Sequence, residues 1–363
     1  MQKYIPECKR KEIEKFKRQM EYEYDQGIGV MSDGDRKTLA EFCEEYFSVF
    51  TSNLSPLTVR GYKIACYSEN GSLNYFNPDM KLGKITMVQM QNYLNHLAKQ
   101  GKSKKTIRNA RGVLSVLFTK AYKIGYIRNN PSKELTIPFT AKVKEEEKFM
   151  DIETAKLALK YASELGGNYE TLEWLGVLAG MRKGEISGLR FSHIFLDNGM
   201  SEIHVVENRI ANNDCVITKQ PKTAAGRRVI QIPGILAEVL RKKKREYGIK
   251  KLAGGNEFKD DGYVYCDNNG EALHPDTIYR YHYRFMKKLQ EKYPAIDYVK
   301  LHGLRHSYAS IAIETGMSAK SLMSQLGHSE IKMTLGLYAH AFESAKKEGA
   351  ERINEIFQKK NMA

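Results

Sequence analysis

The chain has 363 residues, which is long enough to form two hydrophobic cores. It contains 58 lysines and arginines against 43 aspartates and glutamates, and the resulting net charge of +15 favours a polyanionic partner, although ribosome-associated and membrane-surface proteins share this bias. The charged first residues lack the apolar core of a secretion signal and no stretch approaches a membrane span, so the sequence predicts a cytoplasmic protein without a membrane partner.

The five cysteines form neither a C-x-x-C pair nor a spacing typical of metal ligands. A reducing compartment is the simplest explanation for such isolated thiols. We therefore predict no metal site and assign no chemistry to Cys8, Cys43, Cys66, Cys215 and Cys266.

Residues 1–36 predict a helical extension followed by a hinge. Residues 3–25 are rich in Lys, Arg and Glu with weak helical periodicity, and glycines and polar residues dominate positions 27–35.

Residues 37–128 predict a small all-α domain. Apolar residues recur at helical spacing from Leu39, and capping signals at Ser55, Thr86 and Ser103 start three further helices. The last helix has a row of cations, which either forms a solvated face or binds DNA phosphates without reading sequence. These candidate DNA-binding residues, one of which lies just ahead of the helix, are Lys102, Lys104, Lys105, Arg108, Arg111, Lys120 and Lys123.

Residues 129–148 contain two prolines and a charged run, and they predict an extended interdomain linker. Residues 149–363 mix helical and strand periodicity, which predicts an α+β domain with a small antiparallel sheet. The expected helices lie at 151–165, at 171–179 and from 275 onward, and the expected strands lie at 202–207, 214–219, 228–232 and 263–266.

The last third of the chain contains an ordered set of cations and a tyrosine. His302 and Arg305 are three residues apart near the start of an expected helix, and Gly327, in the position of a left-handed C-cap, precedes His328 and then Tyr338. Guanidinium and imidazole groups stabilise the extra negative charge of a phosphodiester transition state, and Tyr338 would supply the attacking oxygen. Each residue alone would be ordinary packing or a polar contact, but the ordered set predicts an active site.

This set resembles the tyrosine recombinase, or phage integrase, family, and the resemblance extends from about residue 37 to the C-terminus. The run from Gly180 through Leu189 looks like the family's first box, in which Arg182 matches the first catalytic arginine and Glu185 its acidic support. His302 and Arg305 match the second box.

The remaining matches complete the family's catalytic set. His328 matches the histidine often found after the second box, and Tyr338 matches the nucleophile. The run from Pro221 to Arg228, between the expected strands 214–219 and 228–232, resembles the β-hairpin that places a catalytic lysine, here Lys222. Two glycines depart from the commonest pattern, Gly226 in the hairpin and Gly336 just before the nucleophile, but neither removes a catalytic group.

The resemblance implies a site-specific DNA recombinase, similar in layout to integrases of phages and conjugative transposons, that works through a 3′-phosphotyrosine without ATP, a metal or another cofactor. It implies that Lys222 is the general acid and His302 a plausible general base, and it favours DNA contact for the cationic helix. The implied partners are double-stranded DNA at attachment or transposon-end sites, further copies in a homotetramer, and accessory directionality factors. The implied location is cytoplasmic and nucleoid-associated.

Three interpretations of the chemistry remain open. The first is the integrase, the second is a Xer-like dimer resolvase or a type IB topoisomerase-like enzyme, and the third is a DNA-binding protein without catalysis. The third is disfavoured because a binding module needs the cations but not the nucleophile. Because residues 3–25 look like the end of a helix that connects to an arm-site DNA-binding domain in such integrases, we also expect the chain to be truncated or a variant without that domain.

Overall fold

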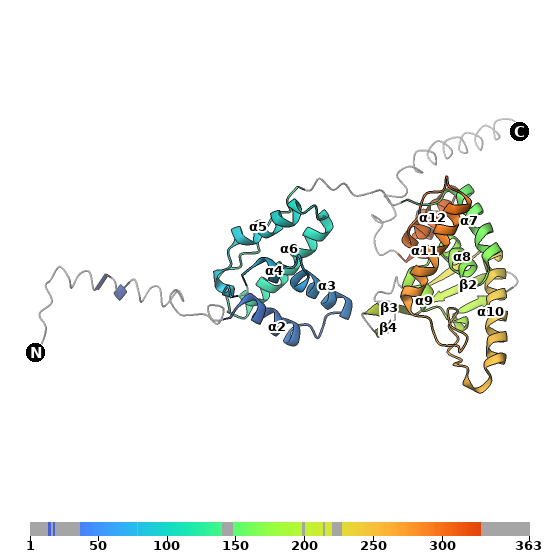
Figure 1. Ribbon diagram of the computed structural model, residues 1–363, viewed down its shortest axis with the longest axis horizontal. Helices are drawn as coiled ribbons and strands as arrows, with labels where there is room; N and C mark the ends of the chain where they lie inside the picture. Colours follow the sequence, from blue (N-terminus) through green and yellow to red (C-terminus); the bar gives the residue numbers. More distant parts are fainter. Residues whose placement is uncertain are drawn as a thin grey trace, which may run out of the picture. The chain divides into compact units, whose positions relative to one another are not determined.

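The computed structural model describes residues 14–15, 17–18, 37–77, 79–139, 148–197, 200–212, 215–219 and 227–327. The chain divides into two compact units, residues 1–145 and 146–363, which are described separately below (Figure 1). None of the helices in the described ranges is long and apolar enough to cross a membrane.

The regular elements described in the first unit are all helices. The sequence predicts the N-caps of three of its helices, and these are confirmed: the hydroxyls of Ser55, Thr86 and Ser103 each accept a hydrogen bond from a backbone N–H in the first turn. Its elements are α2 (Leu39–Val49), α3 (Pro56–Tyr67), α4 (Ser72–Tyr75), the 3-10 helix η2 (Leu82–Lys84), α5 (Met87–Lys99) and α6 (Lys104–Lys123).

The core of this unit forms where α5 and α6 pack together and against α2 and α3. The segment after α6 also contributes, because the Leu135 side chain is buried in this core and the backbone N–H of Thr136 donates to the Gln91 side chain at 2.9 Å. Part of the segment that the sequence assigns to the linker is therefore packed against the helical unit. Residues 140–147 lie outside the described ranges.

The second unit combines helices with two small antiparallel sheets, so the predicted α+β class is confirmed. Its helices are α7 (Ile152–Leu165), α8 (Gly167–Ala179), α9 (Lys183–Ser187), α10 (Gly234–Gly254), α11 (Pro275–Lys292), α12 (Leu301–Glu314) and α13 (Ala319–Leu326), with short 3-10 turns η3 (Phe191–His193) and η5 (Gly255–Glu257). Its strands are β1 (Ile194–Leu196), β2 (Ser201–Val205), β3 (Asn208–Asn212), β4 (Cys215–Lys219) and β5 (Arg228–Ile232).

The strands pair differently from the hairpin expected around Lys222. β4 pairs with β3, whereas β5 pairs with β2 in the sheet β1-β2-β5, so the two strands that flank the lysine belong to different sheets. The burial pattern explains this result. Alternate residues of β5 are buried like those of β2, which lets β5 join the sheet that faces the core, while β4 has no buried residue.

The strand expected at 263–266 is also wrong. Within the described ranges this segment makes only isolated bridges, from Tyr263 to Arg190 and from Cys266 to Ala272. The residues are nevertheless buried, and this burial explains why they resemble a strand in the sequence.

Helix α8 lies at the centre of the second unit and packs against α7, α10, α11 and α12 (Figure 1). Its buried Glu173 accepts a hydrogen bond from Nδ1 of His282 on α11 at 2.9 Å, while the other ring nitrogen of His282 lies 2.9 Å from the Val299 carbonyl oxygen. Because both ring nitrogens face acceptors, the doubly protonated imidazolium satisfies the pair. This contact fixes the chain just before α12 begins.

Candidate active site

Arg182 lies in the sharp turn between α8 and α9. Gly180 ends α8 in the left-handed conformation, with φ +58, and a Cβ there would lie 2.6 Å from the Tyr308 ring, so only glycine fits. Arg182 then forms the N-cap of α9. Its backbone N–H donates to Glu185 Oε2 at 2.9 Å, and its Nη1 donates to Glu185 Oε1 at 2.8 Å. The contact with Glu185 therefore fixes both the backbone and the guanidinium of Arg182.

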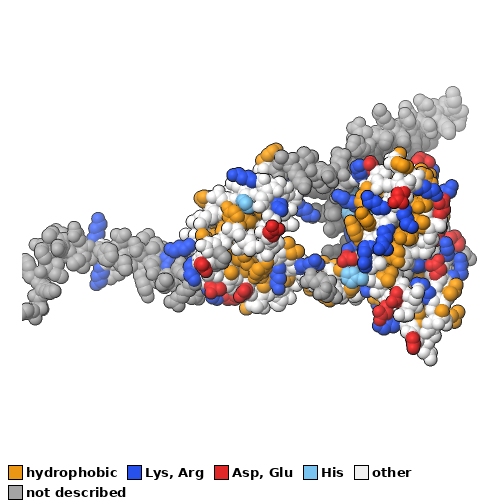
Figure 2. All heavy atoms as spheres, viewed as in Figure 1, with side chains coloured by type: hydrophobic (Ala, Val, Ile, Leu, Met, Phe, Trp, Pro, Cys, Tyr) orange, Lys and Arg blue, Asp and Glu red, His pale blue; other side chains and the backbone are white. Residues whose placement is uncertain are grey.

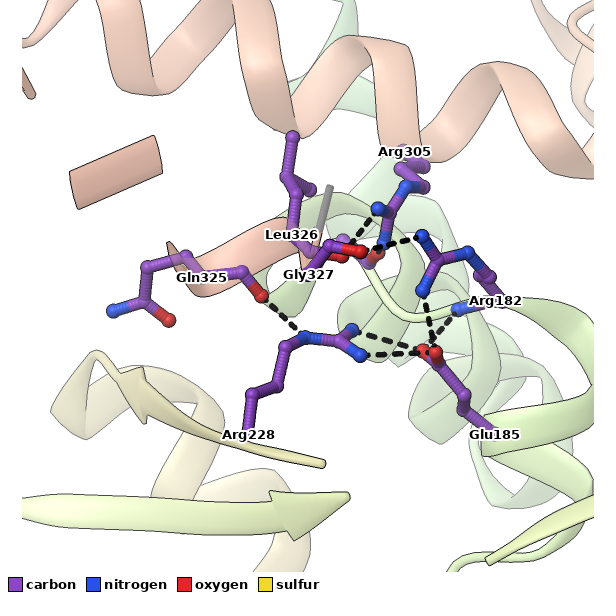
Figure 3. A network of polar contacts seen from close by, with 8 residues as sticks. Arg182, Glu185, Arg228, Arg305, Gln325, Leu326 and Gly327 are labelled. Carbon is purple, nitrogen blue, oxygen red and sulfur yellow. Dashed lines mark hydrogen bonds and ion pairs between the residues drawn. The ribbon is translucent and has the colours of Figure 1, made fainter. Parts of the chain in front are cut away.

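Arg228, the first residue of β5, contacts the same carboxylate from the other side (Figure 3). Its Nη1 and Nη2 donate to the two oxygens of Glu185, each at 2.9 Å, and its Nε donates to the Gln325 carbonyl at 2.6 Å. Arg228 is absent from the predicted catalytic set. The bidentate contact joins residues 43 positions apart, so no local sequence pattern indicates it.

Arg305 approaches from α12 and is 2% exposed. Its Nη1 donates to the Gly180 carbonyl at 2.7 Å, and its Nη2 donates to the Leu326 carbonyl. Burial is the main cause that lowers the pKa of Arg305, and repulsion from Arg182 lowers it further, to about 9. The guanidinium remains protonated at neutral pH, and an anion bound beside it would favour its charged form.

Glu185 carries the compensating charge. Burial alone would raise the pKa of this carboxyl, but the hydrogen bonds and charge of Arg228, together with Arg182, outweigh burial and lower the pKa to about 2. The carboxylate is therefore ionised at neutral pH. One anion beside the three arginines leaves an excess of positive charge, which suits a phosphate.

The C-terminal end of α13 meets all three arginines (Figure 3). The carbonyl of Gln325 accepts from Arg228, that of Leu326 from Arg305, and that of Gly327 from Arg182, the last at 3.2 Å. These carbonyls would otherwise lack partners at the end of a helix. The predicted left-handed C-cap is confirmed, because Gly327 has φ +63, and residue 328 follows it directly.

The two residues of the predicted second box differ in their exposure to solvent. His302 is exposed in the first turn of α12, with its ring centroid 5.0 Å from that of His306, while Arg305 is buried one turn later. The buried face of this helix includes Leu304 and Tyr308. The remaining candidates Lys222, His328 and Tyr338 lie outside the described residues.

The predicted DNA-binding cations lie along α6 and just before it. Lys104, Lys105, Arg108 and Lys123 are exposed, whereas Lys102, Arg111 and Lys120 are partly buried. Lys120 lies over the Phe50 ring, with Nζ 3.9 Å from the ring centroid. The opposite face of the helix packs into the core.

A second row of exposed cations, absent from the sequence prediction, lies on α11. Arg280, Arg284 and Lys288 recur every four residues, with Lys287 beside them, while the other face of the helix is buried. In Figure 2, Lys and Arg side chains gather where Figure 1 draws this helix. The four-residue spacing is the signal that could have indicated this surface from the sequence.

Profiles of known protein families match both units. The phage integrase family matches residues 148–345, and the phage integrase SAM-like domain matches residues 38–137. Together these matches span most of the chain.

The chain is also similar to individual recombinases and integrases. A tyrosine recombinase XerC-like protein of Caldanaerobacter subterraneus subsp. tengcongensis is 28% identical over 357 residues, which cover 92% of this chain and 88% of that protein. The ICEBs1 integrase of Bacillus subtilis is 25% identical, over 75% of this chain and 72% of its own length. The integrase of transposon Tn1549, solved with transposon right end DNA, has a TM-score of 0.67 at 22% identity and covers 87% of this chain and 99% of that chain.

Proposed function

The chain belongs to the phage integrase family and is a tyrosine recombinase, and from this premise we propose that it cuts and rejoins the DNA of a mobile element through a covalent 3′-phosphotyrosine at Tyr338. The observation that supports this proposal best is the cluster of Arg182, Arg228 and Arg305 around Glu185. Such a fixed excess of positive charge stabilises a phosphodiester transition state.

We propose that the Tyr338 oxygen attacks phosphorus and displaces the 5′ oxygen of the next nucleotide. His302 accepts the tyrosine proton, and Lys222 donates a proton to the leaving 5′ oxygen. The new phosphotyrosine bond conserves the energy of the phosphodiester, so a 5′-hydroxyl of a second duplex can reverse the step without ATP.

The arginines contribute to this reaction unequally. Arg182 keeps 34% of its side chain exposed and is placed to contact a non-bridging oxygen, together with Arg305 and His328. Burial and then repulsion from Arg182 lower the pKa of Arg305, and a bound phosphate would oppose both by favouring the charged guanidinium. In this scheme the guanidinium groups supply the charge stabilisation that a metal ion supplies in other phosphoryl-transfer sites.

The partner that we propose is double-stranded DNA. Rows of exposed cations on α6 and α11 suit phosphates, whereas isolated surface charges would not align in this way. Residues 37–128, together with the packed residues around Leu135, would form the core-binding domain, and the rest of 129–148 would form the linker. Residues 149–363 would form the catalytic domain, and residues 1–36 an N-terminal extension. A homotetramer on DNA, accessory directionality factors and a nucleoid location complete the proposal.

A Xer-like resolvase is the second candidate function. It is favoured by the XerC-like relative, which matches 92% of this chain. Resolution of a duplicated host site, with no exchange between transposon-end sites, would support this candidate over integration. Strand exchange between two duplexes separates either recombinase from a topoisomerase.

The test of the proposed chemistry is trapping on nicked DNA. Libraries of nicked duplexes are incubated with the wild-type chain and with Tyr338→Phe in EDTA, and covalently bound strands are sequenced. We expect both proteins to bind DNA and only the wild type to form an adduct that survives denaturant, because the variant lacks only the nucleophilic hydroxyl. An adduct in Tyr338→Phe would place the nucleophile elsewhere.

A further inference from the structure

We propose that Arg228 is a positioning residue for the recombination reaction, which acts on Arg182 through their shared partner Glu185. The inference rests on the proposed function. Arg228 lies at the start of β5, outside both boxes that match the family's catalytic motifs. Three of its N–H groups donate to Glu185 and to the Gln325 carbonyl.

Burial separates the role of Arg228 from that of Arg182. The Arg228 side chain is 4% exposed, against 34% for Arg182, and its two Nη atoms both point to the Glu185 carboxylate. Direct contact with DNA would require Arg228 to leave the buried Glu185 carboxylate, and a buried ion without a partner is strongly destabilising. Arg228 therefore influences the phosphate through its neighbours.

Glu185 transmits this influence because its two oxygens are shared. Oε1 accepts from both Arg182 and Arg228, and Oε2 accepts from the Arg182 backbone N–H and from Arg228. Hydrogen bonding and charge from Arg228 are the largest favourable causes of the low pKa of Glu185. Without Arg228, the carboxylate would turn to Arg182 alone and neutralise more of the charge that the phosphate needs.

Arg228 also fixes the end of α13. Its Nε donates to the Gln325 carbonyl, and a second bond joins the same elements, from the Gln231 backbone N–H to Gln325 Oε1 at 3.2 Å. The carbonyl that follows two residues later, at Gly327, accepts from Arg182. Arg182 is therefore held at two points, and Arg228 supports both.

The test uses Arg228→Lys in the full chain, because lysine keeps the charge but lacks the planar donor pair that holds both carboxylate oxygens. The exposed neighbour in Arg227→Lys is the matched control. Single-turnover adduct formation is measured at saturating protein on a nicked duplex, and DNA affinity is measured separately. We expect Arg228→Lys to slow adduct formation about 10²-fold, the cost of a small misplacement at a reacting centre, with DNA affinity retained. Arg227→Lys should react at nearly the wild-type rate.

Two further measurements distinguish positioning of Arg182 from a general structural effect. In an Arg182→Ala background, Arg228→Lys should cost less than about threefold, because the residue through which Arg228 acts is absent. A duplex with sulfur in place of the 5′ bridging oxygen needs no proton on its leaving group. It therefore compensates only for the loss of a general acid and should not rescue Arg228→Lys. A cost of about 10²-fold in both backgrounds, or rescue by the sulfur substrate, would overturn the inference.

Folding is checked by thermal unfolding of each variant. If Arg228→Lys is unfolded at the assay temperature, Glu185→Gln replaces it, because the amide has a similar shape but no charge. We expect the same loss of about 10²-fold in adduct formation, and a wild-type rate in Glu185→Gln would overturn the inference. Absence of any adduct with the wild-type chain would instead contradict the proposed function, so the two failures are distinguishable.

Discussion

The cations of the candidate active site and those on the helix surfaces differ in how they are held. Arg228 and Arg305 are almost fully buried and bound to defined acceptors, whereas Lys104, Lys105 and Arg108 on α6 lie exposed along one helix. Buried groups have a fixed geometry and cannot be exchanged without loss, while exposed charges are hydrated and act largely through their number. The first group suits chemistry at one phosphorus atom, and the second suits attraction of a polyanion.

The largest effect expected from this comparison concerns Lys222. If it is the general acid, Lys222→Ala should slow cleavage by about two to four orders of magnitude, and a 5′-bridging sulfur substrate should restore the rate. Lys219→Ala on β4 is the control and should have a far smaller effect. Equal losses in the two variants, measured by single-turnover adduct formation, would show that general charge rather than one proton donor is removed.

A similar but smaller loss is expected for Arg305→Lys. Lysine cannot bond to the Gly180 and Leu326 carbonyls with the guanidinium's geometry, so we expect cleavage about 10²- to 10³-fold slower. The sulfur substrate should give no rescue, because the missing group would stabilise charge on non-bridging oxygens. Cleavage at the wild-type rate would show that charge alone, without fixed geometry, is sufficient at this position.

Neutralising the exposed cations of α6 should weaken DNA binding and leave the rate of DNA cleavage unchanged. For the triple variant Lys104→Gln, Lys105→Gln, Arg108→Gln, the slope of log affinity against log salt should fall by roughly one for each phosphate that these side chains neutralise in the wild type. Adduct formation at saturating protein should be unchanged. A reduced rate at saturation, with the salt dependence intact, would contradict the division between the two kinds of cation.

The smallest effect is on stability and concerns the buried Glu173–His282 pair. Burial would lower the pKa of His282, but the charge and hydrogen bond of Glu173 and the Val299 carbonyl outweigh it and raise the pKa. This contribution to the free energy of unfolding is therefore complete below the unfolded pKa of about 6.5 and is lost as pH rises through the higher folded value. His282→Gln should lower Tm most at acidic pH, and a Tm difference that grows with pH would contradict this sign.

Local signals allowed much of the fold to be predicted. The hydroxyl caps at Ser55, Thr86 and Ser103 and the left-handed Gly327 each depend on a few neighbouring residues, which the sequence shows directly. The order of helices and strands in the second unit has the same origin, because residue periodicity reports the buried face.

Contacts between distant residues could not be predicted in this way. The pairing of β5 with β2 depends on matched burial of two strands separated along the chain, and the role of Arg228 depends on a carboxylate 43 positions away. For Arg182, Glu185 and Arg305 the family resemblance indicated the residues. The structure added the bond from Arg182 to Glu185 and the separate carbonyls at the end of α13 that accept from the two arginines.

The proposed chemistry requires that Tyr338 attacks the phosphodiester and remains bound to a 3′-phosphate. It can be tested by trapping the wild-type chain on a nicked duplex, digesting the adduct with protease and nuclease, and identifying the modified peptide by mass spectrometry. We predict a single nucleotide-bearing peptide that contains Tyr338, joined through a 3′-phosphate. A nucleotide on another residue, or a 5′-phosphate linkage on Tyr338, would contradict the proposed attack.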